Sequence, residues 1–160
     1  TRKESSAASD VYKRQALRVD RMAQFYVHTG MIGLEGVKMS KSLGNLVFVH
    51  KLVEAGEDPS AIRLGVFAGH YRDERDWSDE VLEEAKRRLA AWREALAKPG
   101  SLAGAQAVVA KLRAAIANDL DTPSALAAVD DWAEGDRGAE EEGAADLVRT
   151  ALNSLLGVQA

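Results

Sequence analysis

Apolar residues recur every three or four positions through the last two-thirds of the chain, a spacing typical of amphipathic helices. Three predicted helices begin at Asp58-Pro59, Ser78 and Thr122-Pro123, where capping residues or prolines suit a first turn. Two more are indicated by the apolar spacing over 108–116 and 147–155. The acidic, glycine-rich stretch 134–143 is expected to be a solvated loop. Because short helices are marginal alone in water, we expect these to pack together as a bundle, with the tryptophans as packing residues.

The stretch before these helices has a different pattern. Between residues 22 and 49, short apolar runs are separated by glycines, and Glu35-Gly36 suits a tight turn, so we predict a hairpin over 30–38. The run 46–49 is either a short strand or the first turn of a helix, which periodicity does not decide. Residues 1–15 are polar without a period and contain SSAASDVYKRQ, which resembles translated adapter sequence, so we expect a disordered, non-native tail.

Composition and charge narrow the functional classes. The 160 residues contain no run of about eighteen apolar side chains, so we expect no membrane-spanning segment and a cytoplasmic protein. Cysteine is absent and the histidines, His28, His50 and His70, are widely spaced, so no local metal site is predicted. Residues 118–146 hold ten acidic residues and a single base, Arg137, a balance that disfavours nucleic acid.

The string Lys38-Met39-Ser40-Lys41-Ser42 carries the candidate chemistry. Two lysines three positions apart offer two mobile ammonium groups, the serines add hydroxyls, and nearby glycines give the backbone freedom to close over a ligand. Such a loop suits a triphosphate, because ammonium groups beside a departing pyrophosphate stabilise the charge that develops in the transition state. No GxxxxGK[ST] loop is present. Two lysines and two serines alone would also fit a solvated surface turn.

The full string, followed by Leu43-Gly44-Asn45, resembles the signature loop of class I aminoacyl-tRNA synthetases, most closely the cysteinyl branch. The resemblance runs from about Arg21 to the end of the chain, through 26–33, Asp58-Pro59, 69–72 and 119–123. It implies a mainly α fold. Residues 16–57 would be the end of a Rossmann-like α/β, ATP-binding catalytic domain with its hairpin and loop, and 58–160 a helical bundle domain.

The resemblance also implies catalytic roles. Lys41, and after it Lys38, would stabilise charge on the pyrophosphate of ATP, and Met39 would anchor the loop on apolar neighbours. These residues would also belong to the ATP-binding site.

Four further residues would complete the ATP-binding set. Ser40 and Ser42 would contact phosphate or cap the following turn. Main-chain groups of Ile32 would meet adenine, which is compatible with burial of its side chain. His28 would border the nucleotide pocket, or be structural.

Two groups of enzymes in this branch form cysteinyl-AMP from ATP and L-cysteine. One charges tRNA, and the other joins cysteine to the amine of glucosaminyl-inositol in mycothiol biosynthesis. The stretches 26–42, 45–72 and 76–92, together with the acidic C-terminal third, resemble the mycothiol ligases, so small-molecule substrates and no nucleic acid are expected. Leu43 favours the tRNA-charging alternative. A non-catalytic helical binding module is a second alternative.

The branch also binds ATP through an HIGH-type motif and selects cysteine with a zinc ion held by cysteine and histidine ligands. Neither can be found in this sequence, so the zinc ligands are expected outside the chain. We therefore expect a C-terminal fragment of an ATP-dependent carbon–nitrogen ligase that is inactive by itself. The oligomeric state is left open.

Overall fold

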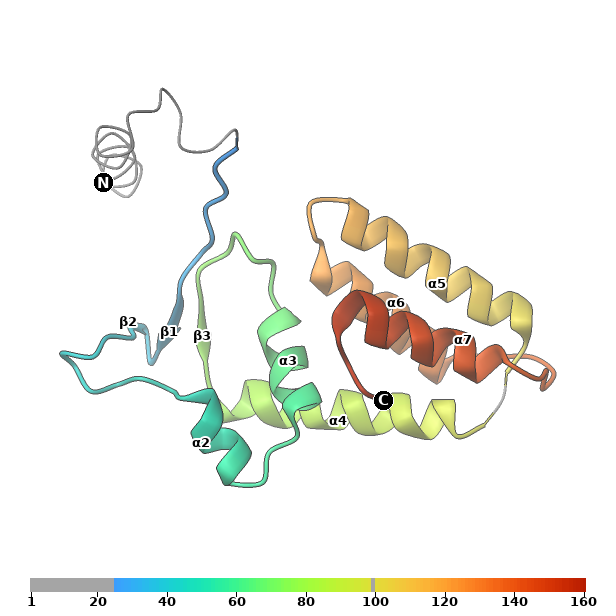
Figure 1. Ribbon diagram of the computed structural model, residues 1–160, viewed down its shortest axis with the longest axis horizontal. Coiled ribbons are helices and arrows are strands. Elements are labelled where there is room, and N and C mark those ends of the chain that lie inside the picture. The colour runs from blue at the N-terminus through green and yellow to red at the C-terminus, as the bar shows by residue number, and fades with distance from the viewer. Residues whose placement is uncertain (1–24, 99) are drawn as a thin grey trace, which may run out of the picture.

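The computed structural model describes residues 25–98 and 100–160, so the expected tail at 1–15 lies outside the described part (Figure 1). In chain order the elements are β1 (Ile32–Leu34), β2 (Val37–Lys38), α2 (Val49–Glu54), α3 (Pro59–Phe67), β3 (Arg75–Trp77), α4 (Asp79–Leu96), α5 (Leu102–Ala117), α6 (Thr122–Glu134), α7 (Ala144–Ala151) and the short π-helix η1 (Leu152–Leu156). The prediction of a mainly helical protein is confirmed.

The helices α4, α5, α6 and α7, with η1, pack around one continuous apolar core, and we call this group the helical bundle. Its centre is formed by fully buried side chains, among them Trp92, Leu112, Leu126 and Leu152. Side-chain caps fix three of the helix starts, because Ser78, Ser101 and Asp121 each accept a hydrogen bond from an amide of the first turn. The start predicted at Thr122-Pro123 is confirmed, with Asp121 as its capping residue.

Trp92 ties two helices of the bundle together through a polar contact. Its Nε1 donates to Asp130 Oδ1 at 2.7 Å, and Arg88 Nε donates to Asp130 Oδ2 at 2.9 Å, so α4 and α6 share a partly buried ion pair. Trp77 is also buried and Trp132 packs half-buried at the edge of the core, so the packing roles predicted for the tryptophans are confirmed.

The loop predicted over 134–143 is present, but it is more than a solvated acidic stretch. Glu141 Oε2 accepts a hydrogen bond from the amide of Leu102 at 2.5 Å, and the Glu141 amide donates to Gly100 O at 3.0 Å. A carboxylate at this position satisfies an amide in the first turn of α5 that has no partner within the helix. The expectation of simple solvation was therefore wrong for Glu141.

A three-stranded sheet lies beside the bundle, with strand order β2-β1-β3. β1 and β2 are antiparallel, and the turn between them places Glu35 and Gly36 at φ of 54° and 73°, so the predicted hairpin is confirmed. β3 was not predicted. It pairs parallel with β1, in a register that sets Ile32 opposite Arg75.

The sheet and α2 form the second part of the molecule, which we call the sheet unit (25–54 and 69–77). The run 46–49 was predicted to be either a strand or the first turn of a helix. Only Val49 is helical, as the first residue of α2, and 46–48 form neither a strand nor a helix. Trp77, at the end of β3, packs with Ile62 of α3 and Leu82 of α4. This small cluster fastens the sheet to the helices.

α3 serves both parts of the molecule. It begins as predicted, with Asp58 accepting from the Ser60 amide at 2.8 Å and Pro59 in the first turn. Ala61 and Leu64 face the bundle core, whereas Ile62 faces the Trp77 cluster. The sheet crosses the boundary predicted between residues 57 and 58, and the division there stays a prediction. Within the described ranges, none of the helices combines the length and the apolar character needed to cross a membrane.

Candidate nucleotide-binding loop

The chain leaves the sheet after β2 and returns toward α2 through a loop that we call the lysine loop (Lys38–Asn45). Lys38 ends β2, and Lys41 begins the turn at the tip of the loop. Both side chains are exposed, and Gly44 follows at φ 66°. Two ammonium groups therefore stand on a loop whose tip has a glycine in a conformation that other residues rarely adopt.

Asn45 holds the two ends of the lysine loop together. Its Oδ1 accepts a hydrogen bond from the Ser40 amide at 2.9 Å, and its Nδ2 donates to Lys38 O at 3.3 Å. One side chain thus contacts the main chain on both sides of Met39. In the sequence, Asn45 is recognisable only as part of the family string. A clasp of this kind depends on how the chain returns, which local sequence does not reveal.

The serine hydroxyls stabilise the turn. Ser40 Oγ lies 3.1 Å from Ser42 Oγ and accepts a hydrogen bond from the Leu43 amide at 3.3 Å. Ser40 thus makes the turn contact that was one of its two expected roles. Contact of either hydroxyl with a phosphate stays a prediction.

Met39 is the inward-facing residue of the loop. Its side chain packs against the Ile62–Trp77–Leu82 cluster, and its Sδ lies 3.4 Å from the Val47 amide. Met39, Ile32 and Val47 also line a small apolar cavity of about 140 Å³. The residue between the exposed lysines is therefore seated on an apolar floor, which gives the loop a fixed base beneath a free tip.

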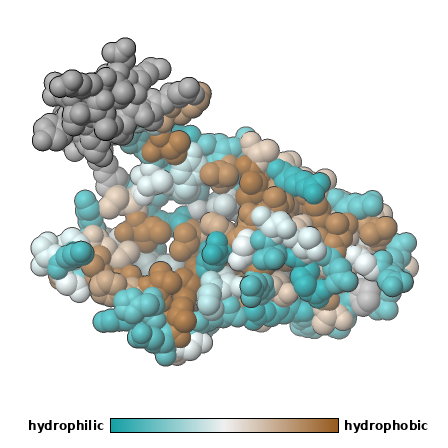
Figure 2. Space-filling model, in the orientation of Figure 1, coloured by the Kyte–Doolittle hydropathy of each residue, from teal (hydrophilic) through white to brown (hydrophobic). Residues whose placement is uncertain are grey.

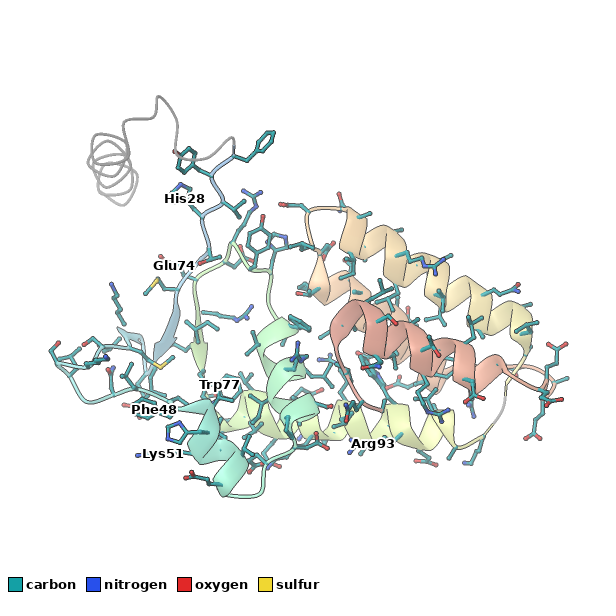
Figure 3. All side chains as sticks on the ribbon, in the orientation of Figure 1. His28, Phe48, Lys51, Glu74, Trp77 and Arg93 are labelled. Atoms are coloured by element: carbon teal, nitrogen blue, oxygen red, sulfur yellow. The ribbon has the colours of Figure 1, made fainter. Side chains whose placement is uncertain are left out.

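Ile32 and His28 belong to β1 and to the segment that precedes it. Ile32 is half-buried in the central strand, and its side chain contacts the same apolar cluster as Met39. His28 is exposed in the extended segment that enters β1 (Figure 3), and no hydrogen bond or ion pair among the described residues joins it to the loop. The structure therefore brings Ile32 and Met39 together but does not bring His28 to the lysine loop.

Two residues of β3 complete the surroundings of the loop and were missed in the sequence. Asp76 Oδ2 accepts from the Gly36 amide at 2.6 Å and so fixes the hairpin turn. Arg75 donates to Val66 O, and burial lowers the pKa of its guanidinium, an effect that Asp73 opposes. Both residues line a pocket of about 380 Å³ that also includes Lys38.

Apolar side chains are also exposed on the sheet unit. Phe48, Val49 and Val53 lie at the start of α2 or along it, and all three are exposed. Figure 2 shows apolar surface in this region of the molecule. The sheet unit thus covers its apolar residues less completely than the bundle does.

The described residues do not fit the zinc ion that the family resemblance implies. No group of three or more histidine, aspartate or glutamate side chains in 25–98 and 100–160 could hold a metal, and the sequence has no cysteine. Soft thiolate ligands are therefore not available in this chain.

Comparison with known proteins identifies the family. A model of the family described as tRNA synthetases class I (C) catalytic domain matches residues 8–87. The chain is 64% identical over 153 residues to the L-cysteine:1D-myo-inositol 2-amino-2-deoxy-alpha-D-glucopyranoside ligase of Corynebacterium aurimucosum, a match that covers 94% of this chain and 37% of the relative. Proteins of the same name from Saccharomonospora viridis and Streptomyces avermitilis are 57% and 55% identical over 143 and 139 residues, covering 85% and 86% of this chain and 34% of each relative.

The chain therefore spans little more than a third of the length of these relatives. The resemblance predicted from the lysine loop is confirmed, both for the class I synthetase family and for the ligases named above. Because the family model covers half of the 160 residues, including the sheet and the lysine loop, this chain belongs to the family of class I tRNA synthetase (C) catalytic domains.

Proposed function

We propose that the chain is the C-terminal part of an ATP-dependent ligase that activates L-cysteine as cysteinyl-AMP and transfers it to the amine of glucosaminyl-inositol, in mycothiol biosynthesis. The observation that carries the proposal is 64% identity, over 94% of the chain, to a relative with this ligase name. In this reading residues 16–57 end the ATP-binding catalytic domain and 58–160 form a helical bundle domain. A cytoplasmic location is part of the same proposal.

The first step would be formation of the adenylate. A carboxylate oxygen of cysteine attacks the α-phosphorus of ATP, and the bond from that phosphorus to the bridging oxygen of pyrophosphate breaks. Negative charge grows on the departing pyrophosphate, where Lys41 and Lys38 would stabilise it with their ammonium groups. Because this interaction is stronger in the transition state than in bound ATP, it raises the rate more than the affinity.

The second step would be transfer. The amine nitrogen of glucosaminyl-inositol attacks the acyl carbon of cysteinyl-AMP, AMP leaves with the electrons of the acyl–oxygen bond, and the nitrogen loses a proton to give the amide. No residue of this chain is assigned to that proton transfer.

The geometry of the loop supports the first step. The exposed tip at Lys41 is free to approach a triphosphate, whereas Asn45 and Met39 hold the base of the loop on the sheet. Closure of such a loop excludes water and completes the charge environment only when ATP is bound. The main-chain groups of Ile32, in β1, would contact the adenine ring. His28, in the exposed segment before β1, is a weaker candidate for the nucleotide pocket.

Zinc remains part of the proposal only by family resemblance, with ligands outside this chain, and no step is assigned to it here. The substrates would be ATP, L-cysteine and glucosaminyl-inositol. The acidic stretch 118–146 supports a small-molecule acceptor, because a surface for tRNA needs lysine and arginine against phosphate. Leu43 favours charging of tRNA as a second candidate function.

The test uses the complete gene product that carries this sequence. Cysteine-dependent exchange of pyrophosphate into ATP is expected, followed by amide formation with glucosaminyl-inositol and no esterification of tRNA. Charging of tRNA without amide formation would instead support the second candidate, and absence of exchange would contradict adenylate formation altogether. The 160-residue chain alone is expected to give no exchange.

A further inference from the structure

Two stretches that lie far apart in the sequence meet at one aspartate. Asp119 Oδ1 accepts hydrogen bonds from the Tyr71 hydroxyl at 2.8 Å and from Arg72 Nη2 at 2.9 Å, and Asp119 Oδ2 accepts from Arg72 Nε at 2.8 Å. The main-chain oxygen of Asp119 lies 3.0 Å from Nε2 of His70. We call these four residues the Asp119 latch. The fork of an arginine on a carboxylate fixes orientation as well as distance.

The backbone that presents Asp119 is strained. Asp119 and Leu120 both have φ of 54°, in the left-handed region that non-glycine residues rarely occupy. Such a conformation is unfavourable for a residue with a side chain, and more so for Leu120 than for Asp119. Burial does not compensate, since Leu120 is 53% exposed at the corner between α5 and α6. The corner therefore holds an unfavourable shape that aims one carboxylate at the segment before β3.

The latched segment is also the backbone partner of the residues that enter β1. The Gly30 amide donates to Tyr71 O at 2.8 Å, and the Arg75 amide donates to Met31 O at 3.1 Å. The approach is so close that a Cβ on Gly30 would lie 2.1 Å from Asp73 O. Displacement of Tyr71 would therefore move the start of β1, and β1 leads through the hairpin to Lys38.

β3 has two attachments of different kinds. At its end, Trp77 is buried against Gly65 and the apolar cluster. None of these contacts involves a residue of the Asp119 latch. At and before its start the contacts are polar: Tyr71 and Arg72 make half-exposed contacts with Asp119, Thr122 Oγ1 lies 3.4 Å from Gly69 O, and Arg75 donates to Val66 O of α3. Exposed ion pairs add little stability, so the latch affects the placement of β3 more than the stability of the fold.

We propose that Asp119 is a positioning residue for adenylate formation, which holds the start of β3, and through it β1 and the lysine loop, in register with the helical bundle. The inference rests on the proposed function. Asp119 contacts no substrate in this scheme and acts through Tyr71 and Arg72. The bundle thereby takes part in orienting the nucleotide site although it supplies none of the lysines.

The first experiment compares kinetics in the complete gene product. Asp119→Asn suits the left-handed backbone but removes the charge and one of the two acceptor oxygens facing Arg72. We expect kcat/KM for ATP in pyrophosphate exchange to fall about 10-fold, because small displacements of reacting groups cost one to two orders of magnitude. KM for cysteine should change less than about twofold and the melting temperature by less than about 2 °C.

Two further variants make the result specific. Glu94→Gln removes an exposed ion pair of 3.2 Å between Glu94, near the end of α4, and Lys98, just after that helix, and it should leave the kinetics unchanged. Arg72→Gln should resemble Asp119→Asn, and the double variant should be no worse than either single one, since both remove the same contact. Unchanged ATP kinetics in Asp119→Asn, or additive losses in the double variant, would overturn the proposal.

The second experiment needs no activity. In hydrogen exchange on the complete gene product, Asp119→Asn should speed exchange of the Gly30 and Arg75 amides, whereas amides inside α4 and α6 should keep their rates. If the Gly30 and Arg75 amides exchanged at the same rates in Asp119→Asn as in the parent, the latch would be overturned even if the enzyme is active. If the complete gene product shows no cysteine-dependent exchange, the proposed function fails, and hydrogen exchange then decides the latch separately.

Discussion

The helical bundle and the sheet unit are held together by different kinds of interaction. The bundle has a continuous apolar core in which Trp92, Leu126 and Val129 are almost completely buried. The sheet unit contributes Trp77 to a cluster of three buried residues, against which partly buried side chains such as Met39 pack, and single hydrogen bonds, such as those made by Asn45 and Asp76, add to this. Segments with few apolar contacts open at low free energy, which suits the proposed closure of the lysine loop over ATP. We therefore expect the helical bundle to be the more stable part of the molecule and the sheet unit the part that opens more readily.

Electrostatics follow the same division. In the bundle, charged groups cap helices or pair across them, as Arg88 does with Asp130. In the lysine loop, Lys38 and Lys41 are exposed, and neither forms an ion pair with another residue of 25–98 or 100–160. Charges that are already paired contribute to folding, whereas charges on an exposed loop remain available to a phosphate. The predictions below test whether the two parts can be perturbed separately.

The largest expected effect is on the bundle. Trp92→Ala removes a fully buried ring and its hydrogen bond to Asp130, and it should lower the free energy of unfolding by about 3–5 kcal/mol in urea denaturation of the chain. Trp132→Ala, at a half-buried position, is the matched control and should cost clearly less. A loss below about 1 kcal/mol for Trp92→Ala would contradict the idea that this core carries the stability.

Substitution of Lys41 is expected to have the opposite effect, a loss of activity without a loss of stability. Lys41→Ala in the complete gene product should reduce kcat for pyrophosphate exchange by about 10²–10³-fold, because one charge-stabilising group is lost from the transition state. The melting temperature should stay within about 2 °C, since the side chain is exposed. Lys111→Ala, at an exposed position on α5, is the control and should leave both quantities unchanged. Equal kcat values for the two variants would remove Lys41 from the chemistry.

The same contrast explains which features could be predicted from the sequence. Helix starts are local signals, so Asp58-Pro59 and Ser78 were sufficient to place α3 and α4. The hairpin was predictable because Glu35-Gly36 supplies a turn at positive φ. β3 was not predictable, because Arg75–Trp77 is a short charged segment whose partner strand lies on the far side of two helices in the chain.

For the candidate site, the chemical groups could be predicted but their fixation could not. The string that contains Lys38 and Lys41 is recognisable without a structure. The contacts of Asn45 with both loop ends, of Asp76 with the hairpin and of Asp119 with Arg72 depend on chain segments that meet only after folding. Each is a single polar side chain, and no periodic pattern marks it.

Asn45 offers a smaller perturbation that sharpens the boundary between the fixed and free parts of the loop. Asn45→Ala removes both hydrogen bonds across the loop base, and we expect kcat for exchange to fall about tenfold with a small change in stability. Asn45→Asp keeps the acceptor for the Ser40 amide but lacks the donor to Lys38 O, so it should fall between the parent and Asn45→Ala. If Asn45→Ala matched the parent in kcat, the loop base would need no clasp.

The smallest expected effect tests α3, which both parts share. Asp58 caps this helix and lies 2.8 Å from Arg93 of α4. Burial tends to raise the pKa of Asp58, but the Ser60 amide and Arg93 outweigh it, so the pKa is lowered from 3.8. Because the pKa is lower in the folded state, the carboxylate stabilises the fold at pH values above the pKa that Asp58 has in the unfolded chain. This contribution is lost as pH falls through the folded value.

Asp58→Ala should therefore cost about 0.5–2 kcal/mol at neutral pH, measured by urea denaturation, and the difference from the parent should shrink below pH 3.8. Asp58→Asn keeps the cap acceptor but loses the charge facing Arg93, so it should cost about 0.5 kcal/mol or less. A pH-independent difference for Asp58→Ala would assign the effect to packing. If the loss were as large in Asp58→Asn as in Asp58→Ala, the ion pair rather than the cap would join α3 to the bundle.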